Sequence, residues 1–89
     1  MVKKRHLPKG LEIIYEDGDI LVVDKHAGLL TVGTETNKTR TAYYHLTDYV
    51  RKGNLKSRKR IFIVHRLDQW TSGVLVFAKS QAVKQRLQA

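Results

Sequence analysis

Residues 64–79 read VHRLDQWTSGVLVFAK, a stretch in which a polar loop separates two apolar runs. β-Branched and aromatic residues flank this loop on both sides, a pattern typical of strands in the core of a sheet. We therefore expect strands over residues 61–67 and 74–79. The loop is longer and more charged than a simple turn requires, with His65, Arg66, Asp68, Gln69, Trp70, Thr71 and Ser72. This composition favours a site on a rigid scaffold.

A blander interpretation of the same loop stays open. Arg66 and Asp68 could simply pair across a solvated turn, while Trp70 caps the core. For an arbitrary short motif, that structural explanation is the commoner one. The rest of the sequence has to separate the two interpretations.

Net charge is the most informative property of the whole chain. Its 89 residues contain 17 Lys and Arg against 8 Asp and Glu, a formal net charge of +9. Such an excess usually indicates a polyanionic partner, most often RNA or DNA. The excess is concentrated in RKGNLKSRKR at 51–60 and MVKKRHLPKG at 1–10. A solvated loop would explain either segment alone, but together they favour phosphate contact, so we expect Arg58, Lys59 and Arg60 to bind RNA.

The composition also argues against several kinds of site. The chain has no cysteine, which removes disulfides, thiolate metal sites and cysteine nucleophiles. We expect neither a metal nor a redox cofactor. No apolar run approaches the roughly 20 residues of a membrane span, and the basic start is not followed by the apolar core of a signal peptide. The sequence therefore predicts a cytoplasmic protein without membrane contact.

The first half of the chain predicts a hairpin and a loop. Apolar residues at 13–15 and 20–23 predict two short strands, and the Asp-Gly-Asp between them is a turn signal. Residues 25–37 are rich in Gly and Thr without helical periodicity, so we expect an extended loop in which Gly28 and Gly33 supply unusual backbone angles. A loop of this kind could lie close to a ligand.

Two helices complete the predicted secondary structure. Apolar residues recur at helical spacing over 41–52, and Thr39 or Thr41 is expected as the N-cap. Gly53 follows the last turn as the expected C-cap. Ser80 is expected to cap a final helix that runs towards the chain end. The order of elements indicates an α/β (α+β) fold with a mixed or antiparallel sheet and flanking helices.

The motif residues also carry a family likeness. VHRLDQWTSGVLVFAKS resembles the active-site motif of the RNA pseudouridine synthases of the HRLD type, which isomerise uridines in ribosomal and transfer RNA. IIYEDGDILVVDKHAGLL is similar to the first strands and glycine loop of that family, and the helix at 41–52 lies where the family has one. The likeness extends over residues 11–87. A strand, loop, strand context is far more specific than a four-letter match.

The resemblance implies that Asp68 is the catalytic aspartate and that Arg66 takes the place of the flipped uridine in the RNA. Isomerisation of uridine involves no net oxidation and no transferred group, so no cofactor is expected. A carboxylate beside the anomeric carbon could attack it or could remove a ribose proton, and the sequence leaves both roles open. Arg66 could instead hold Asp68 or a backbone carbonyl in place. His65 is expected to be a positioned loop histidine without a proton-transfer role.

The chain departs from the family pattern in two places. The family has Lys, Pro, any residue, Gly after the second strand, whereas this chain has His26 at the proline position, which removes the rigidity of that proline. The family's catalytic domain is considerably longer, and its later motifs supply a tyrosine that stacks on the uracil and a basic residue that pairs with the aspartate. Neither is matched here. The sequence therefore predicts a basic segment at 1–10 and, over 11–89, the N-terminal part of a catalytic domain, incomplete or inactive as this chain.

The alternative function is a catalytically silent basic RNA-binding module. In either case the expected partner is ribosomal or transfer RNA. A partial domain also leaves strand edges and an apolar face uncovered, which predicts homo-oligomers through those exposed edges.

Overall fold

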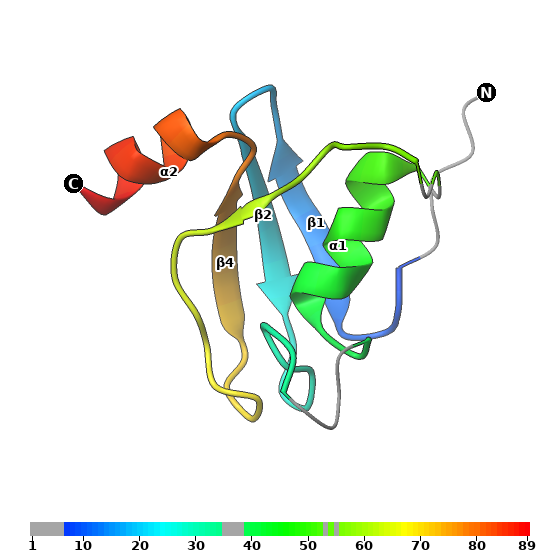
Figure 1. Cartoon of the computed structure of the whole chain (residues 1–89). Helices are drawn as coiled ribbons and strands as arrows, with labels where there is room; N and C mark the ends of the chain where they lie inside the picture. Colours follow the sequence, from blue (N-terminus) through cyan, green and yellow to red (C-terminus); the bar gives the residue numbers. More distant parts are fainter. Residues whose placement is uncertain (1–6, 35–38, 53, 55) are drawn as a thin grey trace.

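The computed structural model describes residues 7–34, 39–52, 54 and 56–89. Within these residues one four-stranded sheet is flanked by helices (Figure 1). The elements are β1 (Leu11–Glu16), β2 (Ile20–Lys25), α1 (Ala42–Arg51), β3 (Phe62–Ile63), β4 (Gly73–Ala78) and α2 (Gln81–Gln88). The strands lie in the order β1-β2-β4-β3, and each pair of neighbours is antiparallel. This architecture confirms the expected α+β fold with an antiparallel sheet.

β1 and β2 form the hairpin that the Asp-Gly-Asp sequence predicts. The Asp17 carboxylate accepts hydrogen bonds from the backbone N–H groups of Asp19 at 2.8 Å and Ile20 at 2.9 Å. A side chain that bonds to the backbone two or three residues ahead is the usual way in which Asp closes a turn. The register of the hairpin shifts between Ile13 and Tyr15. Such bulges blunt an edge strand against pairing with another chain.

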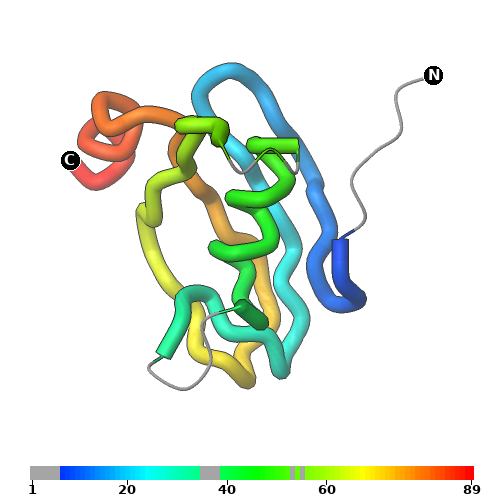
Figure 2. Tube along the Cα trace, turned by 45° about the vertical axis from the view of Figure 1, so that its right-hand side comes forward, coloured from blue at the N-terminus to red at the C-terminus, as the bar shows by residue number. Residues whose placement is uncertain are grey.

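The hydrophobic core lies between the sheet and α1, which crosses one face of the sheet (Figures 1 and 2). Alternate residues of β2 and β4 point to this face, as the period of two in a strand requires. The core consists of Leu11, Leu21, Val23, Ala42, Leu46, Ile61, Leu75 and Phe77, each at most 3% exposed. On the opposite face Tyr15 is 51% and Val74 is 54% exposed. The sheet therefore has one covered face and one open, partly apolar face.

Both helices begin at predicted caps. The Thr41 hydroxyl accepts a hydrogen bond from the Tyr44 N–H at 2.9 Å, and the Ser80 hydroxyl accepts one from the Val83 N–H at 3.2 Å. At the other end of α1 it is Lys52 that adopts the left-handed conformation, with φ of 53°. The expected C-cap Gly53 lies outside the described residues. Neither helix in the described part of the chain is long and apolar enough to cross a membrane.

One expectation about the motif strands is wrong. β3 contains only Phe62–Ile63 instead of 61–67, because the chain leaves the edge of β4 after Ile63. β4 is an interior strand, paired along its whole length with β2 and at one end with β3. The free edges of the described sheet belong to the bulged β1 and the two-residue β3. The predicted self-association through strand edges would therefore use β1 or β3.

Candidate active site

Two loops meet at one end of the sheet. The motif loop, residues 64–72, enters β4, and the glycine loop, residues 26–31, leaves β2. Because β2 and β4 are antiparallel and Lys25 is paired with Gly73, both loops lie at the same end. Figures 1 and 2 show the two loops side by side in both views. Hydrogen bonds between them define the geometry of the candidate site.

Successive residues of the motif loop alternate between anchoring and exposure. Three residues hydrogen-bond to distant parts of the fold through a side chain or the backbone: His65, Leu67 and Gln69. The residues between and after them are exposed: Arg66, Asp68 and Trp70. The hydrogen bonds thus hold the loop against the fold while Arg66, Asp68 and Trp70 stay exposed to solvent.

The His65 imidazole takes the place of a strand beside β4. Its Nε2 accepts a hydrogen bond from the Val76 backbone N–H at 3.1 Å, one residue beyond the last β3–β4 pair, Ile63 with Phe77. A backbone N–H that lacks a partner is costly, and the side chain supplies the acceptor where β3 has ended. Only a neutral imidazole with an unprotonated Nε2 can accept this bond. This contact is the positioning role expected for His65.

Thr31 fixes the residue that precedes Asp68. Its buried hydroxyl donates to the Leu67 carbonyl at 2.8 Å and accepts from the Leu67 N–H at 3.2 Å. The Thr31 carbonyl in turn accepts a hydrogen bond from the Tyr43 N–H at 2.9 Å. That N–H belongs to the first turn of α1, where backbone donors have no partner within the helix. One threonine therefore links the motif loop, the glycine loop and α1.

Gln69 joins the motif loop to Gly28. Its carbonyl accepts from the Gly28 N–H at 2.7 Å, and its side-chain amide donates to the Gly28 carbonyl at 3.3 Å. Gly28 has φ of 103°, a conformation that residues with side chains rarely adopt, so its predicted backbone role is confirmed. The same expectation for Gly33 stays a prediction.

Lys25 lies directly beneath the two loops and is fully buried. Its Nζ donates to the carbonyls of His26 at 3.2 Å, Leu29 at 2.6 Å and Gln69 at 3.1 Å. These acceptors use all three N–H groups of an ammonium. Burial lowers the pKa of Lys25, and attraction to the Asp68 carboxylate opposes that shift. Lys25 therefore ties both loops together and places a positive charge under the residue that resembles the catalytic aspartate.

Arg66 and Asp68 are exposed neighbours that do not pair with each other. Neither side chain forms a hydrogen bond or an ion pair with another residue in the described ranges. Trp70 is 75% exposed. The interpretation in which the two charges pair across a turn and the tryptophan caps the core is therefore wrong. The Asp68 carbonyl accepts the Thr71 N–H at 3.0 Å, which closes the turn that follows the carboxylate.

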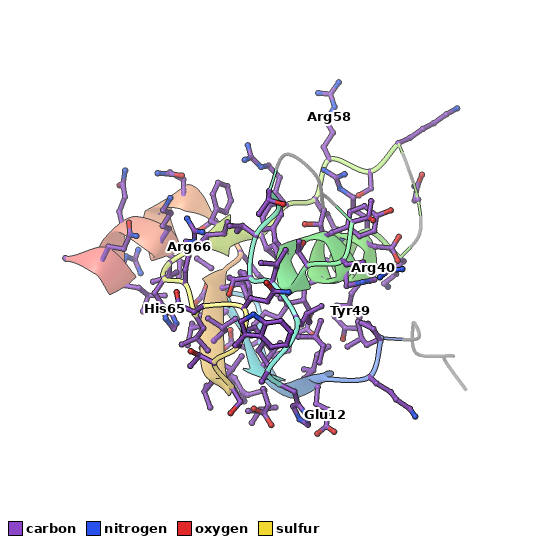
Figure 3. The ribbon with its side chains drawn as sticks, turned by 90° about the horizontal axis from the view of Figure 1, so that it is seen from below. Glu12, Arg40, Tyr49, Arg58, His65 and Arg66 are labelled. Carbon is purple, nitrogen blue, oxygen red and sulfur yellow. The ribbon has the colours of Figure 1, made fainter. Side chains whose placement is uncertain are left out.

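The other predicted RNA-binding residues lie elsewhere. Arg58, Lys59 and Arg60 precede β3 and lie at the opposite end of the sheet from the motif loop (Figure 1). Figure 3 shows Arg58 projecting away from the sheet on the α1 side, whereas Arg66 lies beside His65. The Arg60 guanidinium stacks over the Phe62 ring at 4.8 Å. Of the four cations expected to contact RNA, only Arg66 shares a loop with Asp68.

The sequence analysis did not identify Thr31 and Lys25 as residues that hold the motif loop. The position of Lys25 in β2 could have indicated its role. Leu21, Val23 and Lys25 share one face of β2 by the period of two, and the first two are plainly core residues. A lysine that continues a buried stripe needs internal acceptors. In the described residues no group of three or more His, Asp or Glu side chains could hold a metal ion.

Comparisons with known proteins agree with the motif. A sequence model of the family described as RNA pseudouridylate synthase matches residues 19–89. The chain is 44% identical over 70 residues to a ribosomal large subunit pseudouridine synthase D of Buchnera aphidicola. The match covers 79% of this chain and 22% of the relative. It is 40% identical over 93 residues to an uncharacterized RNA pseudouridine synthase of Aquifex aeolicus. This match covers 97% of this chain and 27% of the relative.

A solved structure shares the fold. Human RNA Pseudouridylate Synthase Domain Containing 4 superposes with a TM-score of 0.63 at 25% sequence identity, over 86% of this chain and 28% of that protein. The chain thus spans about a quarter of the length of the proteins it matches. The family match covers most of the chain and includes the whole motif loop. The chain therefore belongs to the RNA pseudouridylate synthase family.

Proposed function

We propose that this chain serves in the isomerisation of uridine to pseudouridine in RNA, with Asp68 as the catalytic carboxylate. The observation that carries the proposal is the motif loop, which exposes Asp68 between two anchored residues. Thr31 holds the residue before it, and Lys25 and Gly28 hold Gln69 after it. A reacting group held from both sides meets the demand of catalysis for fixed geometry.

The chemistry needs little beyond a placed carboxylate. The bond between uracil N1 and ribose C1′ breaks, the base turns, and C5 bonds to C1′, while C5 loses a proton and N1 gains one. Atoms and electrons balance without an oxidant or a group donor. Asp68 can attack C1′, as the nucleophile of a retaining glycosidase does, or it can remove a ribose proton and so assist departure of the base. Both routes use the ionised carboxylate at the sugar.

Arg66 completes the proposed site. A uridine that reaches Asp68 has to leave its stack, which costs a few kcal/mol, and a side chain that fills the vacated space reduces this cost. The Arg66 guanidinium is exposed, lies two residues from Asp68 and makes no ion pair within the described residues. A planar guanidinium stacks on bases and bonds to phosphates or base edges.

The proposed substrate class is ribosomal RNA rather than transfer RNA, since relatives from Buchnera, Neisseria and Yersinia are named ribosomal large subunit pseudouridine synthase D. In the proposed complex Arg58, Lys59 and Arg60 bind phosphates of the RNA at a distance from the target uridine, because they lie at the other end of the sheet. Self-association through the β1 or β3 edge stays a prediction, which sedimentation of the chain would contradict by showing a monomer at every concentration.

A catalytically silent RNA-binding module is the second candidate. One observation favours it, namely that the chain spans about a quarter of the length of its relatives. Groups that act with the aspartate in those relatives need not lie in the matched quarter. The exposed cations then bind RNA without turnover.

A tritium-release assay tests both candidates. RNA labelled at uracil C5 loses its label when C5 bonds to C1′, so release to water measures isomerisation directly. When this chain is joined to a catalytic domain as long as that of its relatives, we expect release, complete loss in Asp68→Asn, and unchanged RNA affinity and folding in that variant. Asp19→Asn, in the hairpin turn at the far end of the sheet, is the matched control and keeps activity. Release by Asp68→Asn would remove Asp68 from the mechanism, and RNA binding by the unaltered chain without release would favour the binding module.

A further inference from the structure

Trp70 is the most exposed of the large hydrophobic residues that the structure describes. It is 75% exposed, compared with 57% for Ile14 and 47% for Tyr44. It is also the only tryptophan in the chain. Its large side chain gains more from burial than almost any other, and tryptophan is enriched at interfaces, where one end is apolar and the other wet.

The surroundings of Trp70 hold it in place without covering it. It follows Gln69, whose carbonyl is fixed by Lys25 and Gly28. One edge of the indole lies near Gly28, since a Cβ built on that glycine would be 3.6 Å from Trp70 Cζ3. The Thr71 N–H bond to the Asp68 carbonyl closes the turn on its other side. The indole is thus a supported aromatic surface two residues from Asp68.

Charge determines which partner fits this surface. Arg66 is exposed in the same loop, and the net charge of +9 repels a cationic partner and attracts an anionic one. An unpaired nucleotide offers both a phosphate for the guanidinium and a flat base for the indole. Stacking on aromatic side chains is the main way in which proteins hold splayed bases.

We propose that Trp70 is a base-stacking residue that holds an unpaired nucleotide of the RNA next to the uridine at Asp68. The proposal rests on the proposed function of the motif loop and deepens it, because it names single-stranded RNA beside the target as what the loop binds. Trp70 thereby positions the substrate and takes no part in bond making or breaking. Neighbouring stacked bases favour the extruded uridine by holding the strand open.

Intrinsic fluorescence tests the proposal directly, because all tryptophan emission of this chain comes from Trp70. Titration with a single-stranded RNA oligonucleotide is expected to quench this emission and to shield it from acrylamide. A duplex of the same sequence, whose bases are already stacked, is expected to bind with little quenching. Binding of labelled single-stranded RNA, followed by anisotropy, with unchanged Trp70 emission would overturn the proposal.

Variants give a second readout that does not depend on the fluorophore. Trp70→Ala is expected to weaken binding of single-stranded RNA by about 5- to 150-fold, the range for loss of one stacked base, while Trp70→Phe keeps most of the affinity. Tyr15→Ala removes an aromatic side chain that is 51% exposed near the hairpin turn at the far end of the sheet. The affinity of this variant for single-stranded RNA should not change. Equal losses in Trp70→Ala and Tyr15→Ala would overturn the proposal.

The two proposals fail in different ways. Tritium release without quenching or a fall in affinity would leave Asp68 catalytic and remove Trp70 from the site. Quenching with the expected fall in affinity, but without tritium release, would establish the stacking residue in a binding module.

Discussion

The motif loop and the basic loop differ in the hydrogen bonds that hold them. At the motif loop, the bonds join residues far apart in the chain, such as Thr31 to Leu67 across 36 residues and Lys25 to Gln69 across 44. In the basic loop, residues 56–60, the bonds span shorter distances in the chain. The Lys59 N–H donates to the Ser57 hydroxyl two residues away, and the Arg51 guanidinium donates to the Lys59 carbonyl eight residues away. Long-range bonds to buried groups fix a loop against the fold, whereas local bonds only shape it.

This difference matches what each loop is proposed to do. A carboxylate that acts on one carbon of one sugar needs a defined position. Cations that contact phosphates along an RNA strand need only to be near it, because the attraction is long-ranged and independent of sequence. A small domain can therefore combine a rigid reacting loop with an adaptable binding loop.

The largest expected effect is at Lys25. Lys25→Met retains the apolar stem but leaves three carbonyls without their donor, and we expect a loss of about 3 kcal/mol in the free energy of unfolding. The matched control is Lys79→Met, which removes an ion pair to Glu16 in a more exposed setting and should cost at most about 1 kcal/mol. Urea denaturation followed by circular dichroism measures both. Equal losses would show that Lys25 is no special anchor.

The sequence predicted elements whose signals are local. The hairpin turn at Asp17 and the caps Thr41 and Ser80 act within a few residues of themselves, so their patterns are readable from the chain. The length of β3 was not readable, because residues 64–67 have strand-like composition and only the tertiary fold draws them away from β4.

The residues of the candidate site also fall into those that the sequence predicts and those that only the tertiary fold reveals. Asp68 and Arg66 were identified through a motif, and the structure places both on one exposed loop. Thr31 and the acceptors of Lys25 could not be predicted, because their partners lie across loops whose meeting depends on the β2–β4 register. The exposure of Trp70 depends on the same tertiary packing.

A smaller effect is expected at Thr31. Thr31→Val keeps the shape of the side chain but removes the donor and the acceptor for Leu67, at an expected cost of about 1–3 kcal/mol. Thr47→Val is an unusually clean control, because the buried Thr47 hydroxyl has no hydrogen-bond partner among the described residues. That variant should be neutral or slightly stabilising. Thermal unfolding of both variants measures the difference in stability. A loss of stability in Thr47→Val as large as that in Thr31→Val would contradict the role of Thr31 in holding Leu67.

The smallest effect on stability is expected in the basic loop. Replacing Arg58, Lys59 and Arg60 with Gln should change the free energy of unfolding by no more than about 0.5 kcal/mol. RNA affinity should nevertheless fall for all sequences alike, and the slope of log affinity against log salt should decrease by about 0.7 for each single-strand phosphate that the variant no longer neutralises. A salt series of RNA-binding titrations measures the slope. An unchanged slope would assign these cations to solubility alone.

Amide hydrogen exchange of the unaltered chain measures the contrast between the two loops most directly. We expect slow exchange for the N–H groups of Gly28, Leu67 and Val76, whose acceptors are Gln69, Thr31 and His65. The N–H groups of Lys56 and Lys59, which have local acceptors, should exchange near the rate of an unstructured peptide. Protection of the motif-loop amides well above that of the basic loop is the predicted result. Equally fast exchange in both loops would contradict the claim that the fold holds Asp68 in a fixed position.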